Sequence, residues 1–261
     1  MKPFDLLCLV TLGALWDGSF IFMRVAAPEF GPVALISLRV GIAALVLLPL
    51  LAIGGRWKIV LEHAGAMLFI GILNSALPFT LFAFATLTLE AGYSSVINSV
   101  TPLFTALVAW LWLRETLGRA ALLGMSVGLI GVFVLVSAKL QGLQGEAGMA
   151  ILAALIAACS YGVAANYTRA RLGNVGSMEL AAGTLLGASL LMVLPGILYW
   201  PSEPVSTGAW LAVASLGFAC TGFAYVLFFY LINSLRPSRA VTVTYLVPVS
   251  GMVLGAKLLM R

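Results

Sequence analysis

Long apolar runs dominate this chain and decide what it can fold into. A helix needs about 20 mostly apolar residues to cross the hydrocarbon core of a bilayer. Nine runs meet that length, and a breaker or a charged residue lies in each gap between them. The runs cover residues 4–25, 32–53, 64–87, 92–113, 119–138, 147–168, 178–199, 208–231 and 238–259. We therefore expect an all-α polytopic membrane protein.

The composition excludes several other classes of protein. Hydrophobic residues make up 62% of the 261 residues and charged residues 9%, whereas soluble domains have about 25% charged residues. The net charge of +5 does not indicate nucleic-acid binding, because the basic residues lie singly or in pairs rather than on one face. Cys8, Cys159 and Cys220 fall inside apolar runs and indicate neither a disulfide nor a metal framework. We expect no cofactor.

Two features of the N-terminal half set the topology that we expect. The first run is longer than the roughly 7–15-residue apolar core of a signal peptide, so we interpret it as a helix of the mature protein. Basic residues in short loops stay cytoplasmic. With nine spans, the side that holds the N-terminus carries Lys2, Arg56, Lys58, Arg114, Arg119, Arg169, Arg171, Arg236 and Arg239. The opposite side carries Arg24 and Lys139, apart from the C-terminal stretch. We expect a bacterial inner (plasma) membrane protein with a cytoplasmic N-terminus.

The second half of the sequence echoes the first at a nearly constant offset. Pro49 and Pro195 are 146 residues apart, and so are Pro102 and Pro248. We expect a first five-helix repeat over residues 1–140 and a second over residues 145–261 that lacks its last helix. An odd number of helices in each unit would invert the second copy. Inverted repeats are typical of secondary transporters, which bind their solutes near the midplane between the halves.

Four stretches in order resemble the EamA-type branch of the drug/metabolite transporter superfamily. They are Trp16-Asp17-Gly18-Ser19-Phe20 with Arg24, Gly31-Pro32 with Leu38-Arg39, Thr101-Pro102-Leu103 with Leu113-Arg114-Glu115, and Tyr245-Leu246-Val247-Pro248-Val249. The resemblance implies a ten-helix transporter with both termini in the cytoplasm, moving small metabolites, often outward. The sequence departs from the family at Asp17, where glycine is usual, and at Arg261, where an acidic residue and a tenth helix are usual. The ten-helix plan would then have about nine helices in this chain.

Two charged residues, Asp17 and Arg39, lie deep inside predicted spans. Each is 11 residues from Pro28, so each would lie roughly 16 Å below the surface at about 1.5 Å per residue and the two could pair. A charge in hydrocarbon is costly unless it faces protein or water. One interpretation is recognition of a charged solute, or proton coupling through Asp17. The alternative is a buried ion pair that fixes helix packing.

Polar and aromatic residues near the centres of the spans form a second set of candidates. They are Trp16, Asn74, Asn98, Tyr161, Asn166, Tyr225, Thr242, Thr244 and Tyr245. Any one of them is more typical of an interhelical contact, but as a set they indicate a polar cavity. Trp16 and Tyr161 are repeat counterparts and could line opposite walls of it. Pro102 and Pro248 interrupt equivalent helices and are candidates for a hinge or gate, with a static kink as the alternative.

These observations favour a secondary transporter, with an exporter preferred. It would move small metabolites, amino acids or drug-like amphiphiles by alternating access around a central cavity, surrounded by membrane lipid. Protons are the candidate coupling ion, and a homodimer is a possible assembly. A non-transporting membrane scaffold is the main alternative. An intramembrane enzyme is disfavoured, because the sequence has no deep histidine, no second deep acid and no Gly-x-Ser-x-Gly motif.

Overall fold

Helices make up all the regular structure that is described. The computed structural model describes residues 3–115, 118, 123–124, 126–128, 130–131, 134, 137 and 146–234. In these ranges, six helices are long and apolar enough to cross a membrane. They are Pro3–Ile53, Ala64–Thr88, Ala91–Leu113, Glu146–Leu172, Ser177–Leu198 and Thr207–Phe228. The predicted class, an all-α polytopic membrane protein, is confirmed.

The helix bounds follow the predicted apolar runs. In chain order the elements after α1 are α2 (Trp57–Glu62), α3 (Ala64–Gly71), η1 (Ile72–Ala76), α4 (Leu77–Thr88), α5 (Ala91–Asn98), α6 (Thr101–Leu113), α8 (Glu146–Leu172), α9 (Ser177–Leu198), α10 (Thr207–Gly217), η2 (Phe218–Phe223) and α11 (Ala224–Ser234). The predicted run 119–138 is described only in part, and 238–259 lies outside the described residues. The count of nine helices therefore stays a prediction.

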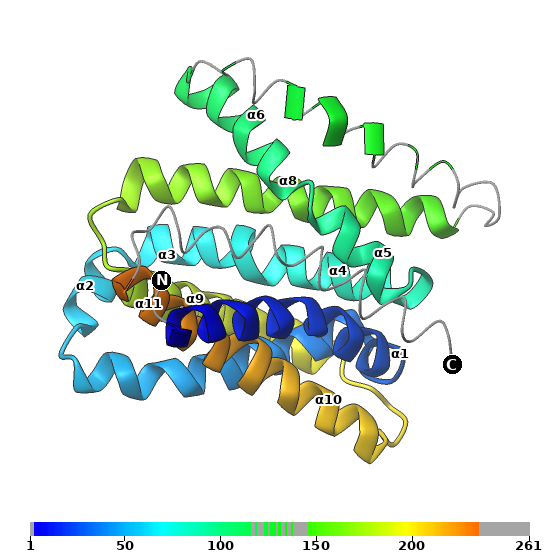
Figure 1. Cartoon of the computed structure of the whole chain (residues 1–261). Helices are drawn as coiled ribbons and strands as arrows, with labels where there is room; N and C mark the ends of the chain where they lie inside the picture. Colours follow the sequence, from blue (N-terminus) through cyan, green and yellow to red (C-terminus); the bar gives the residue numbers. More distant parts are fainter. Residues whose placement is uncertain are drawn as a thin grey trace.

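Helix α1 (Pro3–Ile53) is a hairpin of two spans rather than one rod. Its 51 residues would measure roughly 76 Å if straight, more than twice the thickness of a hydrocarbon core. Gly31 breaks it with φ 71° and ψ 155°, a conformation that glycine adopts at no steric cost. The Arg39 guanidinium reaches back to the sulfur of Met23, 3.5 Å away. The predicted runs 4–25 and 32–53 are thus the two antiparallel arms (Figure 1).

Two close helix contacts recur at the 146-residue offset. A Cβ on Gly71 would lie 2.6 Å from the carbonyl oxygen of Thr184 and 2.9 Å from the amide of Ala188 in α9. A Cβ on Gly217 would lie 2.5 Å from the Cβ of Ile42 in α1. Gly217 is 146 residues after Gly71, and Ala188 is 146 after Ile42. The same glycine contact is therefore made twice, with the two halves of the sequence exchanged.

Two π-helical turns, η1 and η2, also stand at this offset. They begin at Ile72 and Phe218, 146 residues apart. The amide of Leu77 donates to the carbonyl of Ile72, and the amide of Ala224 donates to that of Ala219. Both hydrogen bonds span five residues, as in a π-helix, and such turns occur frequently at functional sites.

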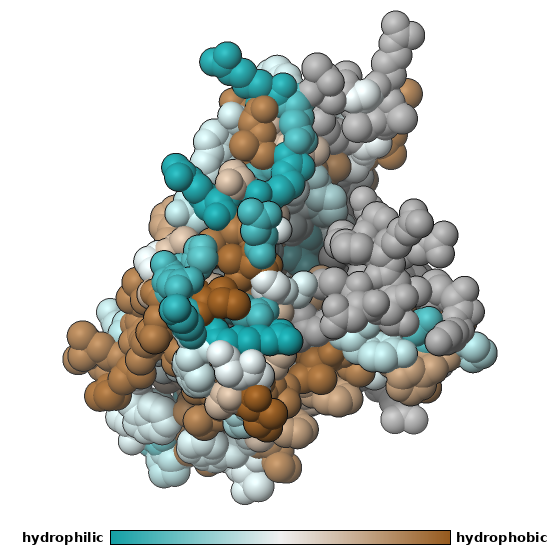
Figure 2. All heavy atoms as spheres, turned by 90° about the vertical axis from the view of Figure 1, so that its left-hand side faces the viewer, coloured by the Kyte–Doolittle hydropathy of each residue, from teal (hydrophilic) through white to brown (hydrophobic). Residues whose placement is uncertain are grey.

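The two ends of the helix bundle differ in charge. Helix α2 with the segment before it, the end of α6 and the end of α8 lie at the left-hand end in Figure 1. These segments carry five of the basic residues that the loop-charge rule assigns to one side: Arg56, Lys58, Arg114, Arg169 and Arg171. Figure 2 looks onto this end and shows hydrophilic residues gathered across it. Two ion pairs join the two halves of the sequence here, Arg56 with Glu179 at 3.2 Å and Arg169 with Glu115. At the opposite end, the Glu29 carboxylate accepts hydrogen bonds from the amide and hydroxyl of Ser206, at 2.6 and 2.7 Å.

Candidate functional site

Arg39 is a buried cation held by helices from both halves of the sequence. It lies in the second arm of α1 and is 4% exposed. Its Nε donates to the hydroxyl of Thr221 in η2 at 3.0 Å, and Nη1 donates weakly to the sulfur of Met23 at 3.5 Å. The guanidinium carbon is 3.7 Å from the centre of the Phe79 ring in α4. This cation–π contact covers one face of the guanidinium.

No carboxylate side chain neutralises Arg39. All nine acidic residues of the chain are among the described residues, and none lies within 4.0 Å of the guanidinium. The buried or bonded acids have other partners: Tyr230 for Asp5, Ser95 for Asp17, Ser206 for Glu29, Arg169 for Glu115 and Arg56 for Glu179. No acidic side chain of the part of the chain that the structure describes therefore compensates the charge of Arg39.

Polar groups from both halves surround this guanidinium. The amide of Asn74 in η1 donates to the hydroxyl of Tyr225 in α11 at 3.5 Å. The ring of Tyr161 in α8 lies 6.4 Å from the Phe79 ring, centre to centre, and both tyrosines are within electrostatic range of Arg39. Asn74, Tyr161 and Tyr225 are partly exposed. We call Arg39, Asn74, Phe79, Tyr161, Thr221 and Tyr225 the Arg39 cluster.

Asp17 does not pair with Arg39, so that predicted pairing is wrong. Asp17 is 3% exposed and accepts a hydrogen bond from the Ser95 hydroxyl in α5 at 2.6 Å. Both residues lie 11 positions from Pro28, but equal distance along the two arms does not make the side chains face each other. Asp17 faces α5, whereas Arg39 faces α4 and η2.

Trp16 and Tyr161 make corresponding aromatic contacts in the two halves, and their place on opposite walls of one cavity stays a prediction. The Trp16 ring is 5.5 Å from the ring of Phe228, and the Tyr161 ring is 6.3 Å from that of Phe82. Phe82 and Phe228 are 146 residues apart. Trp16 packs with a small apolar cluster near the N-terminus, whereas Tyr161 packs against the main core. The aromatic contact is therefore duplicated, like the glycine contact.

Asn98, Pro102 and Asn166 lie away from the Arg39 cluster. Asn98 ends α5 and accepts a hydrogen bond from the Thr101 hydroxyl at 3.3 Å. Pro102 is in the first turn of α6, where its missing N–H removes no helical hydrogen bond. The buried amide of Asn166 donates to the carbonyls of Thr105 and Gly162, both at 2.9 Å, an arrangement typical of helix packing. Three further predicted site residues, Thr242, Tyr245 and Pro248, lie outside the described residues, as does Thr244.

Sequence reasoning missed two members of the Arg39 cluster, Phe79 and Thr221, and also missed Ser95, the partner of Asp17. In the sequence, Phe79 is one more apolar residue of a span, and its cation–π contact depends on how the helices pack. Thr221 carried a usable signal, because it lies 146 residues after Ser75, another hydroxyl residue. Among the described residues, no three of His, Cys, Asp and Glu lie together as metal ligands would.

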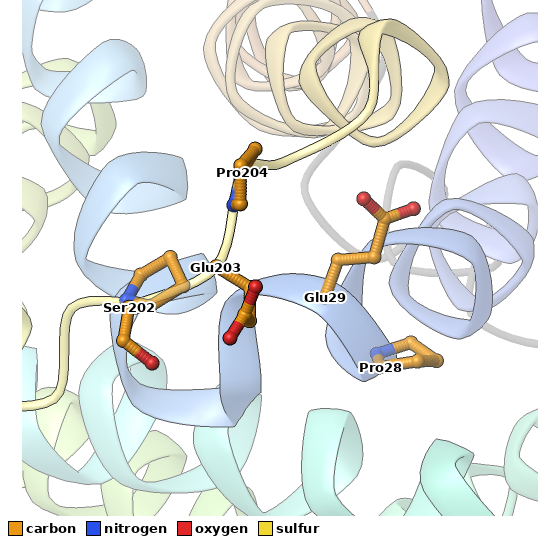
Figure 3. Close-up of a pocket in the computed structure, with 6 residues that line it drawn as sticks. Pro28, Glu29, Ser202, Glu203 and Pro204 are labelled. Carbon is orange, nitrogen blue, oxygen red and sulfur yellow. The ribbon is translucent and has the colours of Figure 1, made fainter.

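A separate cavity of about 340 Å³ lies at the end of the bundle opposite the basic loops. It is lined by Pro28, Glu29, Pro201, Ser202, Glu203 and Pro204. Figure 3 shows the α9–α10 loop crossing beside the turn of α1, with Glu29 and Glu203 pointing in different directions. The Glu29 carboxylate holds this loop by accepting two hydrogen bonds from Ser206. The cavity is thus a surface feature where the halves meet, away from Arg39.

Comparison with known proteins gives one family. The model of the EamA-like transporter family matches two stretches, residues 4–137 and 148–260. Uncharacterized transporter YoaV of Bacillus subtilis (strain 168) is 24% identical over 96% of this chain and 87% of its own length. Uncharacterized inner membrane transporter YedA of Escherichia coli (strain K12) is 26% identical over 96% of this chain and 81% of its own. One crystal structure shares the fold, with a TM-score of 0.63 and 22% identity over 97% of this chain and 88% of that one.

The helices and these relatives define a multi-pass membrane transporter rather than an enzyme. The chain belongs to the EamA-like transporter family, within the drug/metabolite transporter superfamily. The resemblance seen in the sequence motifs is therefore confirmed.

Proposed function

We propose that the chain is a secondary transporter that moves a small metabolite outward by alternating access around the Arg39 cluster. The cluster itself carries this proposal. It combines a buried cation, two tyrosines, an amide and a hydroxyl, contributed by α1, η1, α4, α8, η2 and α11. A buried charge without a counter-ion is costly in a membrane protein and is a functional site by default. Packing alone would not require it.

The inverted repeat that we infer from the sequence would support alternating access. The glycine contact and the π-helical turns each occur twice at the 146-residue offset, and the aromatic contact recurs at offsets of 145 and 146, with the halves exchanged. The two stretches matched by the family model divide the chain in the same way. Two units of opposite polarity around one site can tilt against each other, exposing the site first at one end and then at the other.

The π-helical turns are suited to act as joints in this motion. Asn74 belongs to η1 and Thr221 to η2, so each turn supplies one residue of the Arg39 cluster. The contacts at the two ends would open in turn: Glu29 with Ser206 at one end, and the two ion pairs at the other. The Arg169–Glu115 pair is exposed and an exposed pair contributes only about 0–1 kcal/mol, so opening it costs little. The Glu179 carboxylate is buried, so opening its pair with Arg56 costs more unless water replaces the guanidinium.

Orientation and coupling are further parts of the proposal. A cytoplasmic N-terminus would place the basic end of the bundle inside the cell, and the relative YedA is named an inner membrane transporter. Asp17 is the proposed proton carrier, because it is a carboxylate buried within a span. Replacing Asp17 by Asn should remove the pH dependence of transport measured in proteoliposomes, and an unchanged pH dependence would refute this role.

Cross-linking tests the alternating opening of the ends. In a chain with Cys8, Cys159 and Cys220 replaced by Ala, a reducible bifunctional thiol reagent would join cysteines placed at 29 and 206 at one end, or at 56 and 179 at the other. The purified protein is placed in proteoliposomes with a mixture of the twenty labelled amino acids, and counterflow is measured. Each cross-link should abolish counterflow, and a reductant should restore it. Counterflow that continues unchanged in both cross-linked proteins would refute alternating access. No counterflow before cross-linking would favour a non-transporting scaffold.

A further inference from the structure

We propose that Arg39 is the residue that holds the transported solute, by binding a carboxylate of that solute. This inference rests on the proposed function and names the residue that sets the specificity of that site. The first reason is electrostatic. The chain has nine acidic residues, all described, and none reaches the guanidinium. A cation buried in a membrane protein needs a neutralising partner, and here an anion from outside the chain provides it.

The second reason is the number of donors that stay available. An arginine has five N–H donors, and in the part of the chain described here Arg39 uses two, one of them on the weakly accepting sulfur of Met23. Phe79 lies over a face of the guanidinium, which leaves its edge for an acceptor in the same plane. A carboxylate matches that edge with two parallel hydrogen bonds.

The third reason is the surroundings of the guanidinium. Asn74, Tyr161 and Tyr225 are partly exposed, so the side of the site that they form is open, unlike Arg39 itself. Their amide and hydroxyl groups suit the polar part of a solute, and the rings of Phe79 and Tyr161 suit an apolar side chain. A carboxylate with an attached apolar or aromatic group fits both.

The fourth reason is that the site is single. The residue 146 positions after Arg39 is Leu185, which is fully buried in the core. At this repeat position the second half therefore offers no cation. One carboxylate would bind per chain, and Arg39 would neutralise it while it is bound.

The first test separates solute binding from a merely structural role, because the two roles predict opposite effects on stability when Arg39 is replaced. Arg39→Met keeps the unbranched apolar stem of the side chain and removes the guanidinium with its charge. Without any solute, we expect the purified variant to unfold at the wild-type temperature or above it, because an uncompensated charge has been removed. A fall of more than a few degrees would show that Arg39 holds the fold and would overturn the proposal. Arg24→Met is the matched control, since it removes an exposed arginine that bonds the carbonyls of Thr86 and Leu89.

Matched acids and amides give the second test. The probes are benzoate with benzamide, L-leucine with L-leucinamide, and L-phenylalanine with L-phenylalaninamide. We expect at least one acid to raise the unfolding temperature of the wild type while its amide does not. Arg39→Met should weaken that acid at least 10-fold, and Arg39→Lys should keep part of the effect. The proposal is overturned if amides bind as well as acids, if no acid binds, or if acids still stabilise Arg39→Met.

The same pairs separate this inference from the proposed function. If counterflow continues in Arg39→Met and is equal for acids and amides, the proposal that Arg39 binds a carboxylate is overturned, while the proposed transport function stands. If acids raise the unfolding temperature through Arg39 but no counterflow is measured, the proposed transport function is overturned, while the proposal that Arg39 binds a carboxylate stands.

Discussion

The two π-helical turns have the same place in their halves but different surroundings. In η2, the hydroxyl of Thr221 accepts a hydrogen bond from Arg39. In η1, the corresponding hydroxyl is that of Ser75, which is buried and has no hydrogen-bond partner in the described part of the chain. The counterpart of Arg39 is Leu185. The π-helical turn is thus present twice and the buried charge once. The helices of the two halves are therefore nearly symmetric, whereas the position of the charge is not.

The most severe way to break this comparison is to place the charge in both halves. Leu185→Arg would bury a second cation with no acid to neutralise it, at a cost of several kcal/mol. We expect little or no folded protein, measured as the monodisperse yield from detergent. Leu185→Met, which conserves volume, should cost less than about 1.5 kcal/mol. A normal yield of Leu185→Arg would mean that η1 can accept a guanidinium as η2 does.

The duplicated glycine contact offers the next largest effect. Gly71→Ala would press a methyl group against backbone atoms of Thr184 and Ala188, which cannot move aside without shifting α9, and we expect a loss of about 3 kcal/mol. Gly217→Ala should cost about as much, because the nearest atom, the Cβ of Ile42 at 2.5 Å, is fixed by the backbone of α1. The measurement is the unfolding free energy of each variant. Gly18→Ala is the control, since no atom lies within 4 Å of its added Cβ, and equal stability of all three variants would contradict the expectation.

The two hydroxyl groups should then differ. Thr221→Val removes the acceptor of the Arg39 Nε bond, and a hydrogen bond to a charged group is worth about 2 kcal/mol. Ser75→Ala removes a hydroxyl without a partner, so its stability should stay the same or rise. Unfolding temperatures of the two variants, measured side by side, give the answer. Equal losses would mean that the two turns are equivalent after all.

The smallest expected effect concerns the aromatic pairs. Double-mutant cycles of Trp16 with Phe228 and of Tyr161 with Phe82 should give similar coupling energies, about 0.5–1.5 kcal/mol each. Similar values would show that the frame is symmetric in energy as well as in geometry. A coupling found in one pair alone would extend the asymmetry of Arg39 to the packing around it.

The depth of a residue along its span was predictable from the sequence, but the direction in which its side chain points around the helix axis was not. Hydropathy places the helix bounds well: the run 92–113 became Ala91–Leu113, and 178–199 became Ser177–Leu198. The same counting placed Asp17 and Arg39 at one depth but could not say which neighbouring helix each side chain faces. That depends on the rotation of each arm of α1 about its axis, which packing of the whole bundle determines. The contact of Arg39 with Phe79 and the two π-helical turns depend on the same packing.

The shared position of η1 and η2 also bears on how the chain arose. A π-turn holds one residue more than the α-turn it replaces, so each bulge corresponds to a one-codon insertion in an ancestral helix gene. Two unrelated insertions would seldom land at the same register. If one unit was duplicated, as the 146-residue offset indicates, a single insertion before the duplication would explain both turns, and the difference between Arg39 and Leu185 would be younger than the turn itself.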